Sequence, residues 1–213
     1  MKQKITIAVV LVAFAIAFAG CGNAEKTPAE LEPHYSVSEG LSVQETIQGI
    51  EFDVRLPRVE HSMNLEIERF YDGQISWHER FFRKSHNGDY DLSEWEREMT
   101  LRPVISYSVR EAKGLISVQI RESNTIQGLV FDPDGAIYDK QALLAVYGMT
   151  EEEALQAIMS TVNGGSGYAE IFDCNIYDEQ TLYCTANAGG DLGHGYLLTK
   201  QDGVVTAAPL GEE

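Results

Sequence analysis

The chain has 213 residues, of which 33 are acidic and 16 basic, so its formal net charge at pH 7 is −17. Such a charge repels phosphate backbones, which disfavours nucleic-acid binding and favours a cationic partner. A plainer alternative is that the acidity only keeps the protein soluble. The length suits one domain with a sizeable core.

An export signal is predicted at the N-terminus. Two lysines precede an apolar run over residues 5–18, and small residues then lead directly into Cys21. A basic start, a short apolar middle and small residues before a cleavage site are typical of a secretory signal. The stretch before Cys21 also resembles the lipobox of bacterial lipoproteins, although Phe18 stands where leucine is usual. This resemblance implies that residues 1–20 are removed and that the new N-terminal cysteine carries a diacylglycerol.

An uncleaved membrane anchor is the alternative interpretation of this segment. The apolar run is shorter than the ~20 residues that a helix needs to cross a bilayer. It also lacks a second basic flank, because the next charges after Cys21 are Glu25 and Lys26. We therefore expect a lipid anchor that holds the protein on the extracytoplasmic face of the cell membrane. Loss of the two lysines in the signal changes the net charge from −17 to −19.

Residues 21–40 mix proline, serine, glycine and charges, and this composition predicts a flexible tether. A single extracytoplasmic domain is then expected over residues 41–213. Within residues 41–59, the alternation of Ile50, Phe52 and Val54 predicts a strand with one buried face, and Pro57 is expected to end it.

A helix is predicted over residues 62–85, with Ser62 as its N-cap. Apolar residues recur there at three- and four-residue steps, which indicates one buried stripe: Met63, Ile67, Phe70, Trp77 and Phe81. Gly73 is expected to split or end the helix. The following residues, 86–99, are predicted to form an exposed acidic excursion.

A hairpin is predicted next, from strands over 104–111 and 115–122 joined by residues 112–114. A third strand over 126–132 leads into an Asp-Pro-Asp-Gly turn over 132–135.

Two helices are predicted in the following part of the chain. One covers residues 140–147 and stops at Gly148. The other covers 151–163, where Thr150 and Glu153 match a capping box. Four short strands are predicted in the tail, over 168–172, 181–184, 195–199 and 203–207. This order predicts an α+β fold, a mostly antiparallel sheet with two or three helices packed on it.

Besides Cys21, the chain contains Cys174 and Cys184. With the first cysteine acylated, an even pair in an oxidising compartment predicts a disulfide between the other two. A metal site is a weaker alternative, because the nearest histidine, His194, does not complete a zinc ligand set. We expect no metal and no cofactor.

No catalytic motif is evident in the sequence. Ser166 lies in a glycine-rich stretch, but Tyr168 occupies the place of the second glycine in a nucleophile elbow. The histidines have no metalloprotease spacing: His61, His78, His86 and His194. A non-enzymatic protein is therefore expected. The alternative is an envelope hydrolase assembled from distant residues, for instance His194 with Asp191 or Ser166.

The acidic residues Asp132, Asp134 and Asp139 imitate part of a calcium loop. An EF-hand has glycine at its sixth position and glutamate at its twelfth. Here Gly135 comes fourth and Leu143 twelfth, so a tight turn is the simpler interpretation.

Several blocks, taken in order, resemble a known arrangement: the strand near Phe52, the helix at 64–70, the hairpin at 104–120, residues 128–144, the helix at 151–159 and residues 195–205. They are similar to the extracytoplasmic domain shared by the lysozyme-binding anti-sigma factor of Gram-positive bacteria and some membrane-attached peptidoglycan deacetylases. Residues 114–117, together with Phe131, Asp132 and Gly135, occupy the places of that family's short motifs. Residues 123–128 replace its Gly-Gly-Ala-His stretch.

The resemblance implies a stand-alone sensing or binding domain. Neither a deacetylase domain nor a cytoplasmic sigma-binding segment is expected, so the deacetylase activity does not carry over. We therefore expect a membrane-anchored extracytoplasmic lipoprotein that binds a cationic envelope protein or a peptidoglycan fragment. An accessory structural lipoprotein remains an alternative.

Overall fold

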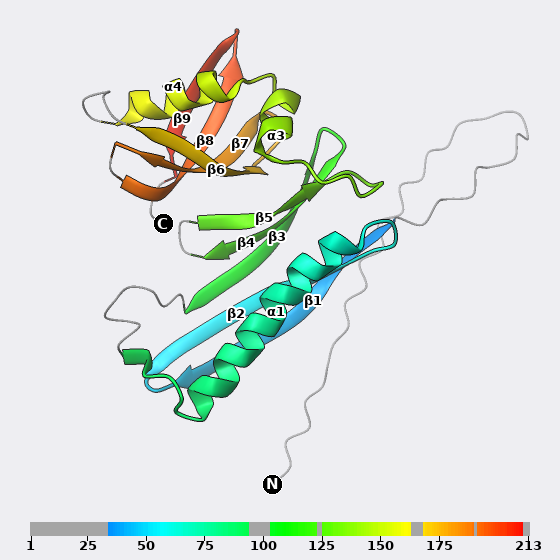
Figure 1. The fold of residues 1–213 in the computed structure, drawn as a ribbon, viewed down its shortest axis with the longest axis vertical. Helices are drawn as coiled ribbons and strands as arrows, with labels where there is room; N and C mark the ends of the chain where they lie inside the picture. The colour runs from blue at the N-terminus through cyan, green and yellow to red at the C-terminus, as the bar shows by residue number, and fades with distance from the viewer. Residues whose placement is uncertain (1–33, 94–102, 123–124, 163–167, 190, 211–213) are drawn as a thin grey trace, which may run out of the picture. The chain divides into compact units, whose positions relative to one another are not determined.

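The computed structural model describes residues 34–93, 103–122, 125–162, 168–189 and 191–210 (Figure 1). These residues form two sheets with helices packed on them, which confirms the predicted α+β class. The predicted signal segment and Cys21 lie outside the described residues. No helix in the part of the chain that the structure describes is long and apolar enough to cross a bilayer.

The first sheet has five strands in the order β1-β2-β3-β4-β5. Their bounds are β1 Tyr35–Ile47, β2 Ile50–His61, β3 Val104–Ala112, β4 Leu115–Glu122 and β5 Thr125–Phe131. Neighbouring strands are antiparallel, except that β2 and β3 form a short parallel pair. The predicted hairpin between β3 and β4 is confirmed. Its turn residues Lys113 and Gly114 have φ angles of 53° and 75°, as a two-residue type I′ turn requires.

The second sheet has four antiparallel strands in the order β6-β7-β8-β9. Their bounds are β6 Ala169–Ile176, β7 Thr181–Ala188, β8 Asp191–Gln201 and β9 Val204–Pro209. Each predicted tail strand lies in one of them. The helices α3 (Lys140–Val146) and α4 (Glu151–Thr161) pack on this sheet, α3 against β6 and α4 against β9 and β6 (Figure 1). The predicted capping box of α4 is confirmed: Thr150 and Glu153 exchange both hydrogen bonds.

The long helix α1 runs from Leu65 to His86 and packs along β2 of the first sheet (Figure 1). Its N-cap is Asn64, whose side chain accepts from the Glu66 amide at 2.9 Å, so the predicted cap at Ser62 is wrong. The helix is continuous through Gly73, against our expectation. A glycine costs about 1 kcal/mol in a helix, and burial of apolar neighbours on the opposite face offsets that cost.

The predicted apolar stripe of α1 is only partly correct. Ile67 and Phe81 are buried, but Trp77 is 53% exposed and Met63, which precedes the helix, is 62% exposed. The buried face also includes residues that the prediction left out: Tyr71, Ile75, His78 and Phe82. Trp77 misses this face because six helical steps from Tyr71 turn the side chain far around the axis.

Two strand boundaries differ from the prediction. The expected tether extends to residue 40, but β1 begins at Tyr35. The ring of Tyr35 is partly buried and packs against the apolar cluster that α1 and the first sheet share. β2 continues through Pro57 because the partner strand is irregular there. The β1–β2 register shifts between Glu39 and Leu41, directly opposite the proline, and such bulges accommodate a residue that lacks an N–H group.

The apolar interior consists of two separate clusters. One lies between α1 and the first sheet. The other lies between α3, α4 and the second sheet, and it also includes Ala112, Leu115 and Val130 of the first sheet. Where β4 faces β6, buried polar groups add hydrogen bonds between the two sheets. This polar junction positions the candidate site.

Candidate functional site

The residues of the hydrolase alternative are not all described. His194 lies on β8 opposite Ala186, and its side chain is exposed. Ser166 and the side chain of Asp191 lie outside the described residues. The hydrolase site therefore stays a prediction.

Two of the three aspartates of the calcium-like segment, Asp132 and Asp139, accept hydrogen bonds from backbone amides. Asp132 Oδ1 accepts from the amides of Asp134 at 3.1 Å and Ala136 at 2.9 Å. Asp139 Oδ1 accepts from the Ala142 amide at 2.8 Å and caps α3. The turn interpretation is confirmed. The described residues contain no group of three or more histidine, cysteine or acidic side chains that could hold a metal ion.

Cys174 and Cys184 are direct partners in the β6–β7 pair, and both are buried. The Cys174 amide donates to Asp173 Oδ1 at 2.9 Å, which marks a non-hydrogen-bonded rung of the ladder. Across such a rung the Cα atoms are about 4.5 Å apart, inside the range that a disulfide spans. The two thiols are free in the structure, so the predicted disulfide stays a prediction.

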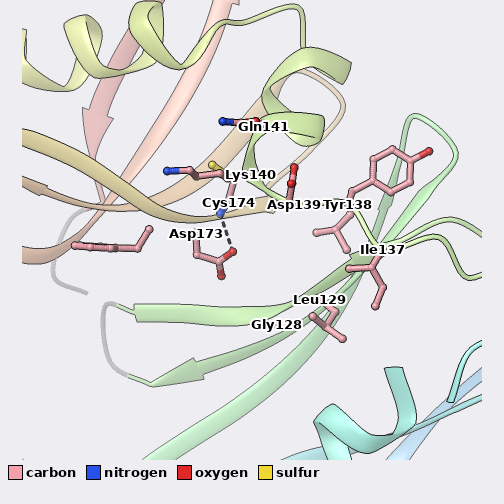
Figure 2. Close-up of a pocket in the computed structure, with 11 residues that line it drawn as sticks. Gly128, Leu129, Ile137, Tyr138, Asp139, Lys140, Gln141, Asp173 and Cys174 are labelled. Carbon is pink, nitrogen blue, oxygen red and sulfur yellow. Dashed lines mark hydrogen bonds between the residues drawn. The ribbon is translucent and has the colours of Figure 1, made fainter. Parts of the chain in front are cut away.

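A pocket of about 510 Å³ opens between β5 and β6, which are edge strands of the two sheets (Figure 2). It is lined by residues 128–130 of β5, residues 172–174 of β6 and residues 137–141, which lead into α3. Ligand pockets commonly measure ≈ 300–1,000 Å³. The size is therefore right for a side chain or a small ligand.

The β5 wall is held in place by close backbone packing. A Cβ atom on Gly128 would lie 2.1 Å from the carbonyl oxygen of Val118, so only glycine fits there. The Tyr71 hydroxyl from α1 enters the β4–β5 ladder, donating to Val118 O at 2.6 Å and accepting from the Leu129 amide at 3.0 Å. These contacts tie the pocket wall to α1.

The β6 wall owes its shape to an irregularity in the strand. The β6–β7 register shifts between Ile171 and Asp173, which leaves Phe172 outside the ladder and 50% exposed. Across the pocket Ile137 is 37% exposed, and Leu129 lines the β5 side. These apolar side chains share the lining with the polar residues 139–141 and Asp173.

The main polar group of the pocket is the carboxylate of Asp173, which points into the space between β6 and β5 (Figure 2). Its oxygens accept from the Cys174 amide at 2.9 Å and from Asn175 Nδ2 at 3.1 Å. Burial raises the pKa of Asp173 above its ordinary value, and these two hydrogen bonds oppose the rise. Within the described residues, no hydrogen bond or ion pair joins this carboxylate to a lysine, arginine or histidine.

A buried polar network holds Asp173 from behind. Asn175, which donates to the carboxylate, accepts in turn from the Ser117 hydroxyl at 3.3 Å. The amide of Gln119 donates to Ser117 Oγ at 3.0 Å and to the carbonyl of Ile176. All these side chains are buried. The network fixes the orientation of Asn175, and so it orients the carboxylate.

Lys140 also lines the pocket, but its ammonium group is bound elsewhere. It donates to Glu151 Oε1 and to the carbonyl of Ile171, each at 2.7 Å. The hydrogen bond to Glu151 raises the pKa of Lys140. In Figure 2 its amino group lies on the far side of β6 from the Asp173 carboxylate. The lysine therefore reinforces the α3–β6 contact rather than neutralising Asp173.

Neither a protein-family model, a curated protein nor a solved structure matches this chain. The resemblance to the domain of the anti-sigma factor and the deacetylases accordingly stays a prediction.

Asp173 was not among the predicted site residues. The one local signal is that this aspartate lies between Phe172 and Cys174, directly after the strand predicted over 168–172. A charged side chain placed there must either face a neighbouring polar group or stay partly exposed.

Proposed function

We propose that this protein is a lipid-anchored extracytoplasmic protein that binds or senses a protein or a cell-wall component and has no catalytic activity of its own. The observation that carries the proposal is the pocket at Asp173. It combines the apolar side chains of Leu129, Ile137 and Phe172 with the fixed carboxylate of Asp173, which lacks a cationic partner among the described side chains. Few, well-placed polar groups in an apolar pocket are typical of binding sites.

The charge of the whole chain supports a cationic ligand. The formal net charge of −17 would raise the local concentration of a basic partner and speed its association. The same charge disfavours nucleic acids and anionic lipid surfaces.

The anchor is tested on the native protein. If Cys21 is acylated, mass spectrometry of material extracted from membranes will show a chain that begins at this cysteine and carries lipid. A Cys21→Ala variant should then carry no lipid, and the lipidated form should be missing from the membrane fraction. An intact initiator methionine without lipid would contradict the anchor.

Binding is tested by calorimetry on the full chain in detergent. The probes are a purified basic envelope protein, soluble muropeptides and, as a control, an acidic envelope protein. We expect saturable binding of at least one of the first two and none of the third. Turnover of an envelope substrate without saturable binding of these probes would replace the proposal with the hydrolase alternative.

A further inference from the structure

The edge of β5 exposes backbone groups to the pocket. The Ile126 amide donates to Tyr183 Oη at 3.2 Å, and the Val130 carbonyl accepts from the Tyr138 amide at 2.8 Å. Both groups therefore point away from β4. Backbone groups alternate direction along a strand, so the N–H and C=O of Gly128, midway between them, also face the pocket. Among the described residues, nothing pairs with Gly128 on this side.

The opposite edge of β6 is already bound at several points. The Ile171 carbonyl accepts from Lys140, the Cys174 amide donates to Asp173, and the Ile176 carbonyl accepts from Gln119. The pocket therefore offers one open backbone rung, at Gly128, and the carboxylate of Asp173. A second carboxylate in the lining, that of Asp139, caps α3 through the Ala142 amide. The open rung and the Asp173 carboxylate together fit a single residue of an extended chain with a positively charged side chain.

We propose that the pocket binds one lysine or arginine side chain on an extended segment of a partner polypeptide. The cationic group donates to the Asp173 carboxylate, and the aliphatic stem packs between Phe172 and Ile137. The backbone of the same segment pairs with Gly128. This inference rests on the proposed function, because it names the ligand class of the same pocket.

Three features of the pocket favour this occupant over a neutral one. Each Asp173 oxygen accepts one hydrogen bond in the structure, and a carboxylate has room for about two on each. Hydrogen bonds between charged groups are roughly twice as strong as neutral ones. The exposed Phe172 and Ile137 match the methylene stem that lysine and arginine bury while their charge stays solvated.

The test uses the full chain in detergent and blocked seven-residue peptides of alanine with lysine, norleucine or glutamate at the centre. Binding is followed by calorimetry and by the amide NMR signals of Gly128 and Phe172. The lysine peptide should bind on the order of tenfold more tightly than the norleucine peptide, as expected for one charge-assisted hydrogen bond. The glutamate peptide should not bind, and the two amide signals should shift only with lysine.

Variants separate the pocket from the general acidity of the chain. Asp173→Asn should weaken the lysine peptide about tenfold, and Phe172→Ala should weaken it by a smaller factor. Glu79→Gln removes the same charge from an exposed position on α1 and should leave binding unchanged. Phe172 is half exposed, so its variant tests the pocket even where Asp173→Asn alters folding.

Equal binding of the lysine and norleucine peptides would overturn the inference, as would equal losses in Asp173→Asn and Glu79→Gln. If muropeptides or the basic protein bind independently of Asp173 while the lysine peptide does not bind, the inference fails and the proposed function stands. If no probe binds at all, both fail.

Discussion

Asp173 is held by neutral groups instead of a cation. Its neighbours are a backbone amide and the side chain of Asn175, and burial raises the pKa of the aspartate above 3.8. A partly buried carboxylate without a counter-ion destabilises the folded state when it ionises. Such a group is easier to explain as a binding determinant than as a source of stability.

The pH dependence of folding should reveal this penalty. Below pH 3.8 the carboxyl is protonated in both states. As the pH rises above that value, the unfolded chain releases the proton first, so the folded state loses stability until the raised pKa of Asp173 is passed. The free energy of unfolding of the wild type, relative to Asp173→Asn, should therefore fall as pH rises through this window.

Urea unfolding of both proteins between about pH 3 and about pH 7 measures this difference. Glu79→Gln, which removes an exposed acid of α1, should not reproduce the profile. A wild type that gains stability relative to Asp173→Asn as the pH rises would show that the folded pKa is lowered instead.

The cysteine pair gives a second prediction for single residues. A disulfide between Cys174 and Cys184 closes a short loop and should stabilise the protein by about 2–3 kcal/mol over its reduced form. In the reduced protein, burial raises the pKa of the Cys184 thiol, so alkylation should be slow until the chain unfolds. Denaturant unfolding with and without reductant measures the stability difference.

The double variant Cys174→Ser/Cys184→Ser is the matched control, and its stability should not respond to reductant. The thiols are counted after the protein from its native source is unfolded without reductant. Two free thiols in this measurement would rule out the disulfide.

At this scale, sequence reasoning selected residues by type and spacing. It paired Cys174 with Cys184, and the structure places them opposite each other. Asp173 was not selected, because its place between Phe172 and Cys174 does not by itself distinguish a partly buried aspartate from the rest of the 33 acidic residues. The importance of that aspartate comes from Asn175, Ser117 and Gln119, and the last two lie on another sheet.

At the scale of elements, Tyr71 couples α1 to the sheet. Its hydroxyl bridges Val118 O and the Leu129 amide, which are register partners in β4 and β5. Tyr71→Phe would remove a buried group that satisfies both backbone atoms. We expect a loss of about 1–3 kcal/mol in the free energy of unfolding, because two buried polar groups lose a partner.

Chemical denaturation measures the loss, and hydrogen exchange at the Leu129 amide reports the local effect. The control is Tyr168→Phe, which changes an exposed tyrosine and should alter stability by less than about 0.5 kcal/mol. A neutral Tyr71→Phe would mean that the two strands close the gap by pairing directly.

Elements specified by neighbouring residues were predicted well. The capping box at Thr150 and the turn at Gly114 depend only on groups within a few positions. The breaks expected at Gly73 and Pro57 did not occur, because packing on α1 and the irregularity in β1 compensate for each residue. Such compensation involves distant parts of the chain, and a local pattern does not contain it.

At the scale of the whole described domain, a polar junction and a shared apolar cluster connect the two sheets. One cluster belongs to α1 and the first sheet, whereas the other joins the second sheet to Ala112, Leu115 and Val130 of the first. Buried hydrogen bonds between β4 and β6 add to these contacts. The sequence predicted one mostly antiparallel sheet. The division into two sheets was not foreseeable, because α3 and α4 separate β5 from β6 and no local pattern shows whether strands on either side of them pair.

This architecture predicts that the junction maintains cooperative unfolding. Asn175 connects Ser117 of the first sheet to Asp173 of the second. Asn175→Ala leaves both partners with one hydrogen bond fewer and should lower the free energy of unfolding by about 1–3 kcal/mol. If the junction, rather than the apolar contacts of Ala112, Leu115 and Val130, couples the two sheets, the denaturation curve should also become less steep as the two parts unfold separately.

Asn87→Ala, at the exposed C-cap of α1, is the control and should change neither the midpoint nor the steepness by much. Hydrogen exchange distinguishes the two modes of unfolding. In Asn175→Ala, amides of one sheet should exchange faster than those of the other, whereas the wild type should protect both alike. A lower midpoint with unchanged steepness and uniform exchange would show that the apolar clusters are coupled by other contacts, and that the junction serves the pocket alone.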